Sequence, residues 1–163
     1  MIGADIMEIS PEINGRQAVL TVPVRMTLAE MLRDRLGLYG VKLSCEMQVC
    51  GVCTVLVEGR PVSSCTFLAV DTDGRRVLTV EGLADGGRLH PIQQAFVDRF
   101  ALQCGFCTPG FIMMTKHLLE RSPQPDREQI VAHFDGNLCR CTGYAPIIEA
   151  VQDAAGKLGE VGS

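Results

Sequence analysis

The sequence predicts an α+β protein with two domains, a strand-rich domain over residues 1–83 and a helical domain over residues 84–163. Apolar residues alternate with a period of two in the first part and recur with a period of about 3.6 in the second. The change falls at a Gly- and Asp-rich segment, residues 84–88, which suits a linker. A chain of 163 residues is long enough for two small domains, each with its own core.

The strands of the first domain are marked by their turns. Asn14-Gly15 and Glu58-Gly59 are typical of tight hairpin turns, because both positions favour a left-handed backbone. Gly74 ends a further turn that begins at Asp71. The strands expected around these turns are 6–13, 18–22, 54–57, 60–62, 66–70 and 77–80.

The helices are marked by their starts. Thr27 and Glu30 form a capping box for a helix that suits an end at Gly37. The second domain has the pattern of a bundle of four helices. Their apolar stripes run over residues 92–100, from Pro109 to 118, from Asp126 to 134 and from Pro146 to 158.

Composition excludes several functions. The net charge is −4 and no basic run is present, so nucleic-acid binding is not expected. No apolar run approaches the ~20 residues of a membrane-spanning helix. Residues 1–10 have no features of an export signal, so we expect a cytoplasmic protein. In that reducing compartment, eight cysteines indicate metal binding rather than disulfides.

The cysteines form two sets of four. Cys45, Cys50, Cys53 and Cys65 have the spacing of a plant-type [2Fe-2S] ferredoxin, in which one loop supplies three sulfurs and a neighbouring strand supplies the fourth. Structural zinc is the alternative, because four thiolates also suit it. Zinc sites usually come as two short knuckles, however, so the compact triple favours [2Fe-2S].

The second set is Cys104, Cys107, Cys139 and Cys141. In an up-down-up-down bundle, the loop after the first helix and the loop after the third lie at the same end. Those two loops carry the two cysteine pairs, so we expect the four thiols to converge there. The N-termini of two helices would also favour a negatively charged thiolate cluster. Zinc remains an alternative at this set as well.

The other polar residues indicate no substrate chemistry. The three histidines, His90, His117 and His133, are scattered and are interpreted as capping or surface residues. Met113 and Met114 suit core packing. The sequence contains no nucleophile elbow, Gly-rich phosphate loop or dinucleotide fingerprint. We therefore expect no catalytic residue on this chain.

Four segments resemble the small iron–sulfur subunit of the molybdenum hydroxylases, the xanthine dehydrogenase, aldehyde oxidase and carbon monoxide dehydrogenase family. They are Gly40-Val-Lys-Leu-Ser-Cys45, Cys50-Gly-Val-Cys53-Thr54, Gln103-Cys-Gly-Phe-Cys-Thr-Pro-Gly110 and Asn137-Leu-Cys-Arg-Cys-Thr-Gly-Tyr144. The resemblance covers nearly the whole chain, and two different four-cysteine patterns occur in the right order.

The resemblance implies an N-terminal plant-ferredoxin-like β-grasp domain and a C-terminal helical domain, each with one [2Fe-2S] cluster. The helical-domain cluster would lie beside the molybdenum–pterin cofactor of a large subunit, and the other would face FAD on a medium subunit. Gln103 and Cys141 occupy positions that touch the pterin in the family. A dimer of heterotrimers is the implied assembly.

The sequence departs from the family at two positions of the first loop, where Ser44 and Gln48 stand at sites that are often Gly. The function expected is electron transfer from molybdenum to flavin during oxidative hydroxylation of a substrate bound elsewhere. A free-standing ferredoxin is one alternative, although the second domain favours docking to a larger partner. A zinc-stabilised interaction module is the other.

Overall fold

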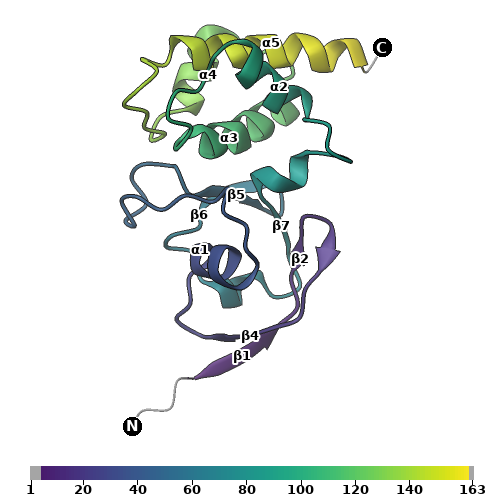
Figure 1. Ribbon diagram of the computed structural model, residues 1–163, viewed down its shortest axis with the longest axis vertical. Coiled ribbons are helices and arrows are strands. Elements are labelled where there is room, and N and C mark those ends of the chain that lie inside the picture. The colour runs from purple at the N-terminus through teal and green to yellow at the C-terminus, as the bar shows by residue number, and fades with distance from the viewer. Residues whose placement is uncertain (1–4, 162–163) are drawn as a thin grey trace.

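The computed structural model describes residues 5–161. Strands and one helix form the N-terminal part, and four helices stack against one end of it, so the molecule is elongated along one axis (Figure 1). The described N-terminal segment and the C-terminal helix lie at opposite ends of that axis. The mixed helix and sheet class predicted from the sequence is confirmed.

Two sheets form the N-terminal part. One is an antiparallel pair of β1 and β4, and the other has five strands in the order β3-β2-β7-β5-β6, with β2 and β7 parallel. The strands are β1 (Ile6–Ile9), β2 (Glu12–Ile13), β3 (Arg16–Gln17), β4 (Leu20–Pro23), β5 (Thr54–Val57), β6 (Arg60–Ser63) and β7 (Arg76–Leu78).

Both hairpin turns predicted from the sequence are present. Asn14 and Gly15 have φ of 51° and 78°, and Glu58 and Gly59 have φ of 50° and 73°. Two consecutive left-handed residues match the twist of the flanking strands, which is why these pairs join β2 to β3 and β5 to β6.

The strand expected at 66–70 is wrong. Leu68 makes a single bridge to Thr27, and a 3₁₀ turn, η2 (Ala69–Thr72), follows it. The physical reason is that the N–H groups of Thr66 and Phe67 turn back to the Ser63 carbonyl, at 3.1 and 3.2 Å. The strand expected at 77–80 is also shifted: β7 ends at Leu78, and η3 (Val80–Leu83) is a 3₁₀ turn.

The helix of the N-terminal part begins as expected and then changes form. In the capping box, Thr27 Oγ1 accepts from Glu30 N–H at 3.2 Å, and Glu30 Oε2 accepts from Thr27 N–H at 2.8 Å. α1 (Leu28–Glu30) continues as a π-helical turn, η1 (Met31–Arg35), and left-handed Gly37 follows it. Its apolar side packs into the first core.

The four C-terminal helices are α2 (Pro91–Asp98), α3 (Thr108–Arg121), α4 (Arg127–His133) and α5 (Ala145–Val161). Asp126 caps α4 at the start expected for that helix, and His90, interpreted as a capping or surface residue, caps α2. Phe111 and Phe134 meet edge to face at 5.0 Å in the helical core. Within residues 5–161, no helix combines the length and apolar character needed to cross a bilayer.

The two parts are joined by shared packing. Cys50, Val52 and Leu56 belong to the N-terminal part in sequence, yet they are buried in the core formed by the helices. Gly110 in α3 lies so close to the first cysteine loop that a Cβ there would be 2.3 Å from the Gly51 carbonyl oxygen. The cysteine loop is therefore held between the sheet and α3.

Candidate metal centre

The first cysteine loop curls around the Cys45 thiol. Glu46, Gln48 and Gly51 have φ of 53°, 62° and 70°, so three left-handed residues bend this short segment. As a result, the N–H groups of residues 49 and 50 point at Cys45 Sγ, each at 3.4 Å. Hydrogen bonds from the backbone N–H groups of residues 47, 49 and 50 lower the pKa of the Cys45 thiol to about 6.

The other thiols of this set are buried. Cys53 ends the loop, and its carbonyl accepts from the Ser64 hydroxyl at 2.7 Å, which ties it to the segment that carries Cys65. Burial and the neighbouring Cys65 raise the pKa of the Cys53 thiol to about 11. The loop carries Cys45, Cys50 and Cys53, whereas Cys65 lies in the turn after β6 and not on a strand as expected.

The second set lies where the α2–α3 and α4–α5 loops meet. Cys141 Sγ is 3.6 Å from Cys104 Sγ, and Cys107 is the residue before α3. Cys139 is fixed by its neighbours: its N–H donates to the Tyr144 hydroxyl at 3.0 Å, and Thr142 Oγ1 donates to its sulfur at 3.2 Å. All four cysteines line a hollow of about 420 Å³.

The thiols of the second set differ in acidity. Burial raises the pKa of Cys107 to about 12, and the nearby Cys139 adds to the effect. Burial also acts to raise the pKa of Cys139, but hydrogen bonds from Thr142 and from the Cys141 N–H outweigh it, so this pKa is lowered. The site thus combines a thiol whose pKa is lowered, Cys139, with one whose pKa is raised, Cys107.

The donor set fits an iron–sulfur cluster. Thiolates are its usual protein ligands, and hydrogen bonds to sulfur, such as those to Cys45 and Cys139, are among the features that set its potential. In the described part of the chain, no three His, Cys, Asp or Glu side chains are grouped as a single metal ion would require. The roles of the eight thiols as ligands therefore stay predictions.

The two cysteine loops touch directly. The N–H of Leu138 donates to the Cys50 carbonyl at 2.9 Å, and Asn137 Nδ2 donates to the Gly51 carbonyl at 3.2 Å. Leu138 precedes Cys139 in the chain, so this hydrogen bond links the backbone of Cys50 to the residue next to Cys139. A Cβ at Gly51 would be 2.3 Å from the Asn137 amide, so this contact also requires Gly at position 51.

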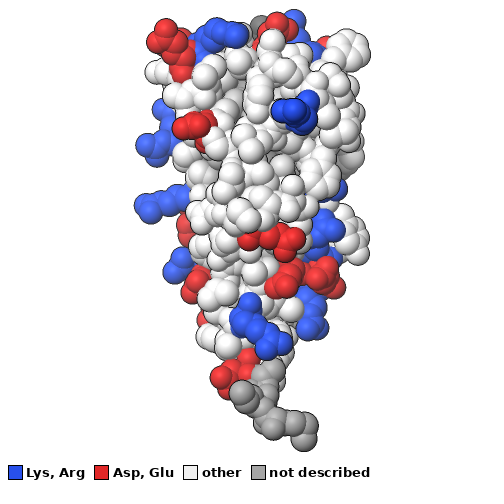
Figure 2. Space-filling model, turned by 90° about the vertical axis from the view of Figure 1, so that its left-hand side faces the viewer, with Lys and Arg blue, Asp and Glu red and all other residues white. Residues whose placement is uncertain are grey.

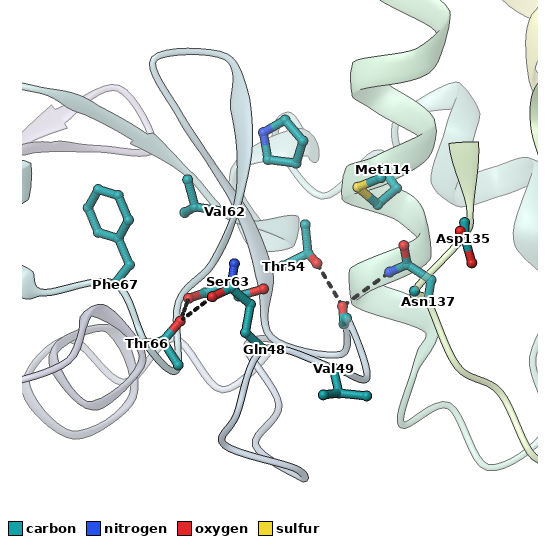
Figure 3. Close-up of a pocket in the computed structure, with 13 residues that line it drawn as sticks. Gln48, Val49, Thr54, Val62, Ser63, Thr66, Phe67, Met114, Asp135 and Asn137 are labelled. Carbon is teal, nitrogen blue, oxygen red and sulfur yellow. Dashed lines mark hydrogen bonds between the residues drawn. The ribbon is translucent and has the colours of Figure 1, made fainter. Parts of the chain in front are cut away.

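Figure 3 shows the cavity that lies beside this contact. It has a volume of about 450 Å³ and opens between the first cysteine loop, β6 and the segment before the second cysteine pair. Thr54 and Asn137 converge on the Gly51 carbonyl from opposite sides. Gln48 occupies its left-handed position while its side chain accepts from the Thr66 hydroxyl at 3.3 Å. The Gln48 departure is thus accommodated by a local contact.

The two residues assigned to pterin contact, Gln103 and Cys141, are exposed beside the exposed Cys104. Their role stays a prediction. Sequence reasoning missed Asn137, Thr142 and Tyr144, which position the second set. A signal was present: all three lie in the segment that carried the resemblance, and a buried Asn such as this one normally has a hydrogen-bond partner.

Comparison with known proteins agrees with this geometry. Residues 11–83 match the "2Fe-2S iron-sulfur cluster binding domain" family, and residues 79–152 match the "[2Fe-2S] binding domain" family. The nicotine 6-hydroxylase small subunit of Paenarthrobacter nicotinovorans is 51% identical over 156 residues, covering 96% of this chain and 94% of that protein. The aldehyde oxidoreductase of Megalodesulfovibrio gigas is 43% identical over 146 residues, covering 88% of this chain and 16% of that protein.

A solved structure has the same fold. Quinoline 2-oxidoreductase from Pseudomonas putida 86 superposes with a TM-score of 0.92 at 45% identity, covering 96% of this chain and 98% of that chain. The family matches favour [2Fe-2S] clusters over zinc for both domains. One relative is named a small subunit and the other is a much longer oxidoreductase chain, which favours a subunit over a free-standing ferredoxin. The chain belongs to the [2Fe-2S] iron–sulfur subunits of the molybdenum hydroxylases.

Proposed function

We propose that this chain relays single electrons from a molybdenum–pterin site on a large subunit to FAD on a medium subunit. Cys104, Cys107, Cys139 and Cys141 hold the cluster that faces molybdenum, with Gln103 and Cys141 touching the pterin. Cys45, Cys50, Cys53 and Cys65 hold the cluster that faces the flavin. The complex is a dimer of heterotrimers in the cytoplasm, where thiols stay reduced.

The observation that carries the proposal is the direct contact between the two cysteine loops. The N–H of Leu138 donates to the Cys50 carbonyl. Cys50 belongs to the first set, and Leu138 is the residue before Cys139 of the second set. Hydroxylation of a substrate with oxygen from water releases two electrons and two protons. Each [2Fe-2S] cluster accepts one electron at a time, so two clusters in series can pass both electrons to a flavin.

This chain contributes positioning and electronic tuning to the reaction. The exposed Cys104 and Cys141 of the second set present one end of the relay to a partner, while Cys53 and Cys107 are buried inside the chain. The N–H donors around Cys45 and Cys139 stabilise negative charge on sulfur. Relatives named for nicotine and quinoline direct the first substrate trials to N-heteroaromatic compounds.

The test is metal analysis followed by rapid kinetics on the complex. The purified chain should contain about four iron atoms and equal acid-labile sulfide, and the reduced protein should give two sets of EPR signals. Replacing Cys50 by Ser should alter one set and leave the other. About two iron atoms in the parent chain, or substrate reduction of flavin without bleaching of the clusters, would contradict the proposal.

A further inference from the structure

The connection from α2 to α3 begins with an aromatic residue in a conformation that favours glycine. Phe100 follows the end of α2 with φ of 51°. The N–H of Ala101 donates to the Phe96 carbonyl at 2.9 Å, and that of Phe100 donates to the Val97 carbonyl at 3.1 Å. This pair of bonds is a Schellman motif, whose left-handed residue is usually Gly because a side chain there is strained.

The side chain at this position does not contribute to the core. Phe100 is 82% exposed, the largest exposed fraction among the described large apolar residues. The apolar contact that accompanies such a cap is supplied by Ala101 and Phe96, which are both buried. A strained backbone that carries an exposed aromatic ring indicates a role outside this chain, since Gly would close the helix at lower cost.

The surroundings of Phe100 suit an interface. Val97, Leu102 and Phe106 are also exposed, and we call these three residues and Phe100, all at the end of α2 or in the connection to α3, the Phe100 patch. Cys104, an exposed thiol of the second set, lies within this stretch of chain. The loops of the second set lie on the left of Figure 1, and Figure 2, which faces that side, shows a broad surface there with few charged side chains, although a Lys or Arg side chain stands within it. Depletion of charge is typical of the centre of a protein interface.

We propose that Phe100 anchors this chain on the molybdenum-cofactor subunit by inserting its ring into an apolar pocket there. This inference rests on the proposed function. The occupant follows from continuity, because the patch adjoins the exposed thiols through which electrons enter, and the subunit that delivers them must cover that surface. In the M. gigas relative, the matching region makes up 16% of one long chain, so there the same two domains are joined covalently to a much larger part.

The experiment uses readouts that change in opposite directions. Phe100→Gly and Phe100→Asn both remove the strain and the ring, whereas Phe100→Leu keeps an apolar side chain in the same backbone. In the full chain with both clusters, Gly should raise Tm by about 2–4 °C. In the assembled complex, Gly and Asn should speed dissociation from the molybdenum-cofactor subunit by about tenfold or more, and Leu by less.

Val19→Ala is the matched control, because Val19 is 69% exposed in the N-terminal part, between β3 and β4. It should change neither readout. A Phe100→Gly variant that is more stable yet dissociates at the parental rate would overturn the proposal. Altered self-association of the Phe100 variants would also overturn it, because the patch would then be covered by a second copy of this chain. A parent chain that binds no molybdenum-cofactor subunit would overturn the proposed function itself, and this inference with it.

Discussion

The acidity of each cysteine is set by its backbone surroundings, which spacing alone does not reveal. The sequence gives the eight positions and their grouping, but Cys45 and Cys53 are only eight residues apart and their thiol pKa values are about 6 and about 11. The difference arises because loop dihedrals turn N–H groups toward one sulfur, while burial isolates the other. On the proposed ligand assignment, cluster binding releases a proton from Cys53 and from Cys107, whereas the pKa of Cys45 favours the thiolate at neutral pH.

This difference predicts the order of alkylation after cluster removal. At pH 7, iodoacetamide should modify Cys45 first, with a midpoint near pH 6, because the thiolate is the reactive species. Cys53 and Cys107 should react slowly until the pH approaches their raised pKa values. Peptide mass spectrometry over a pH series measures this. Equal rates for Cys45 and Cys53 at pH 7 would show that the loop does not hold its shape without a cluster.

At the scale of elements, the sequence predicts what local chemistry determines and misses what tertiary contacts determine. The capping boxes at Thr27 and Asp126 start their helices where the sequence predicts, and a capping box at His90 starts α2. The two turn pairs determine both hairpins. The strand expected at 66–70 fails because its N–H groups find the Ser63 carbonyl instead of a neighbouring strand. The apolar pattern of a helix likewise does not reveal the role of Gly110, although this residue determines how closely α3 approaches the first cysteine loop.

Two helical glycines therefore predict opposite responses to the same substitution. Gly110→Ala should destabilise the chain by about 1–3 kcal/mol, because the new methyl meets the Gly51 carbonyl and neither backbone can yield easily. Gly156→Ala in α5 is the matched control, with no atom within 4 Å of the new Cβ, and should stabilise by about 0.5–1 kcal/mol. Urea unfolding measures both. A Gly110→Ala variant as stable as Gly156→Ala would refute the close approach of loop and helix.

The contact between α3 and α4 predicts a pH dependence. His117 and His133 stack at 5.2 Å, and His133 Nε2 donates to the Met114 carbonyl at 3.1 Å. Burial lowers the pKa of both imidazoles, and Arg121 acts in the same direction. The unfolded chain therefore binds protons more readily, so stability is complete above the unfolded pKa of about 6.5 and is lost as pH falls below it.

His133→Gln should make stability less dependent on pH between 7.5 and 5.5, because the amide can still donate to the Met114 carbonyl but does not titrate. Urea unfolding at several pH values measures the slope, and visible absorption checks that the clusters remain bound. An unchanged slope would mean that the pair is protonated without cost in the folded protein.

At the scale of the whole molecule, the sequence predicts a strand part and a helical part, but it does not predict how the two parts pack against each other. The change of period near residue 84 predicts two units, yet Cys50, Val52 and Leu56 cross over into the helical core. This packing brings the two cysteine loops into contact. It depends on Gly51 and Gly110, where a Cβ would clash, and on the buried Asn137. The spacing of residues in the sequence does not reveal these contacts, because they form only when both parts are folded together.

Asn137→Ala should therefore slow electron transfer between the two clusters more than it destabilises the folded chain. Asn137 Nδ2 donates to the Gly51 carbonyl at 3.2 Å, beside the bond from Leu138 to Cys50, whereas Thr54 keeps its own hydrogen bond to the same carbonyl. We expect a loss of about 1–2 kcal/mol and full occupancy of both clusters. In stopped-flow reduction by substrate, the second cluster should be reduced at a near-normal rate while reduction of the flavin lags.

Gln124→Ala is the control for that variant, because it removes a comparable long-range bond, from Gln124 Nε2 to the Ala155 carbonyl at 3.1 Å, away from both cysteine sets. It should cost similar stability and leave flavin reduction unchanged, since electron transfer depends on how closely the two loops are held and not on overall stability. If both variants slow flavin reduction equally, the delay reflects general loosening. If neither does, the loop contact does not hold the two clusters in register.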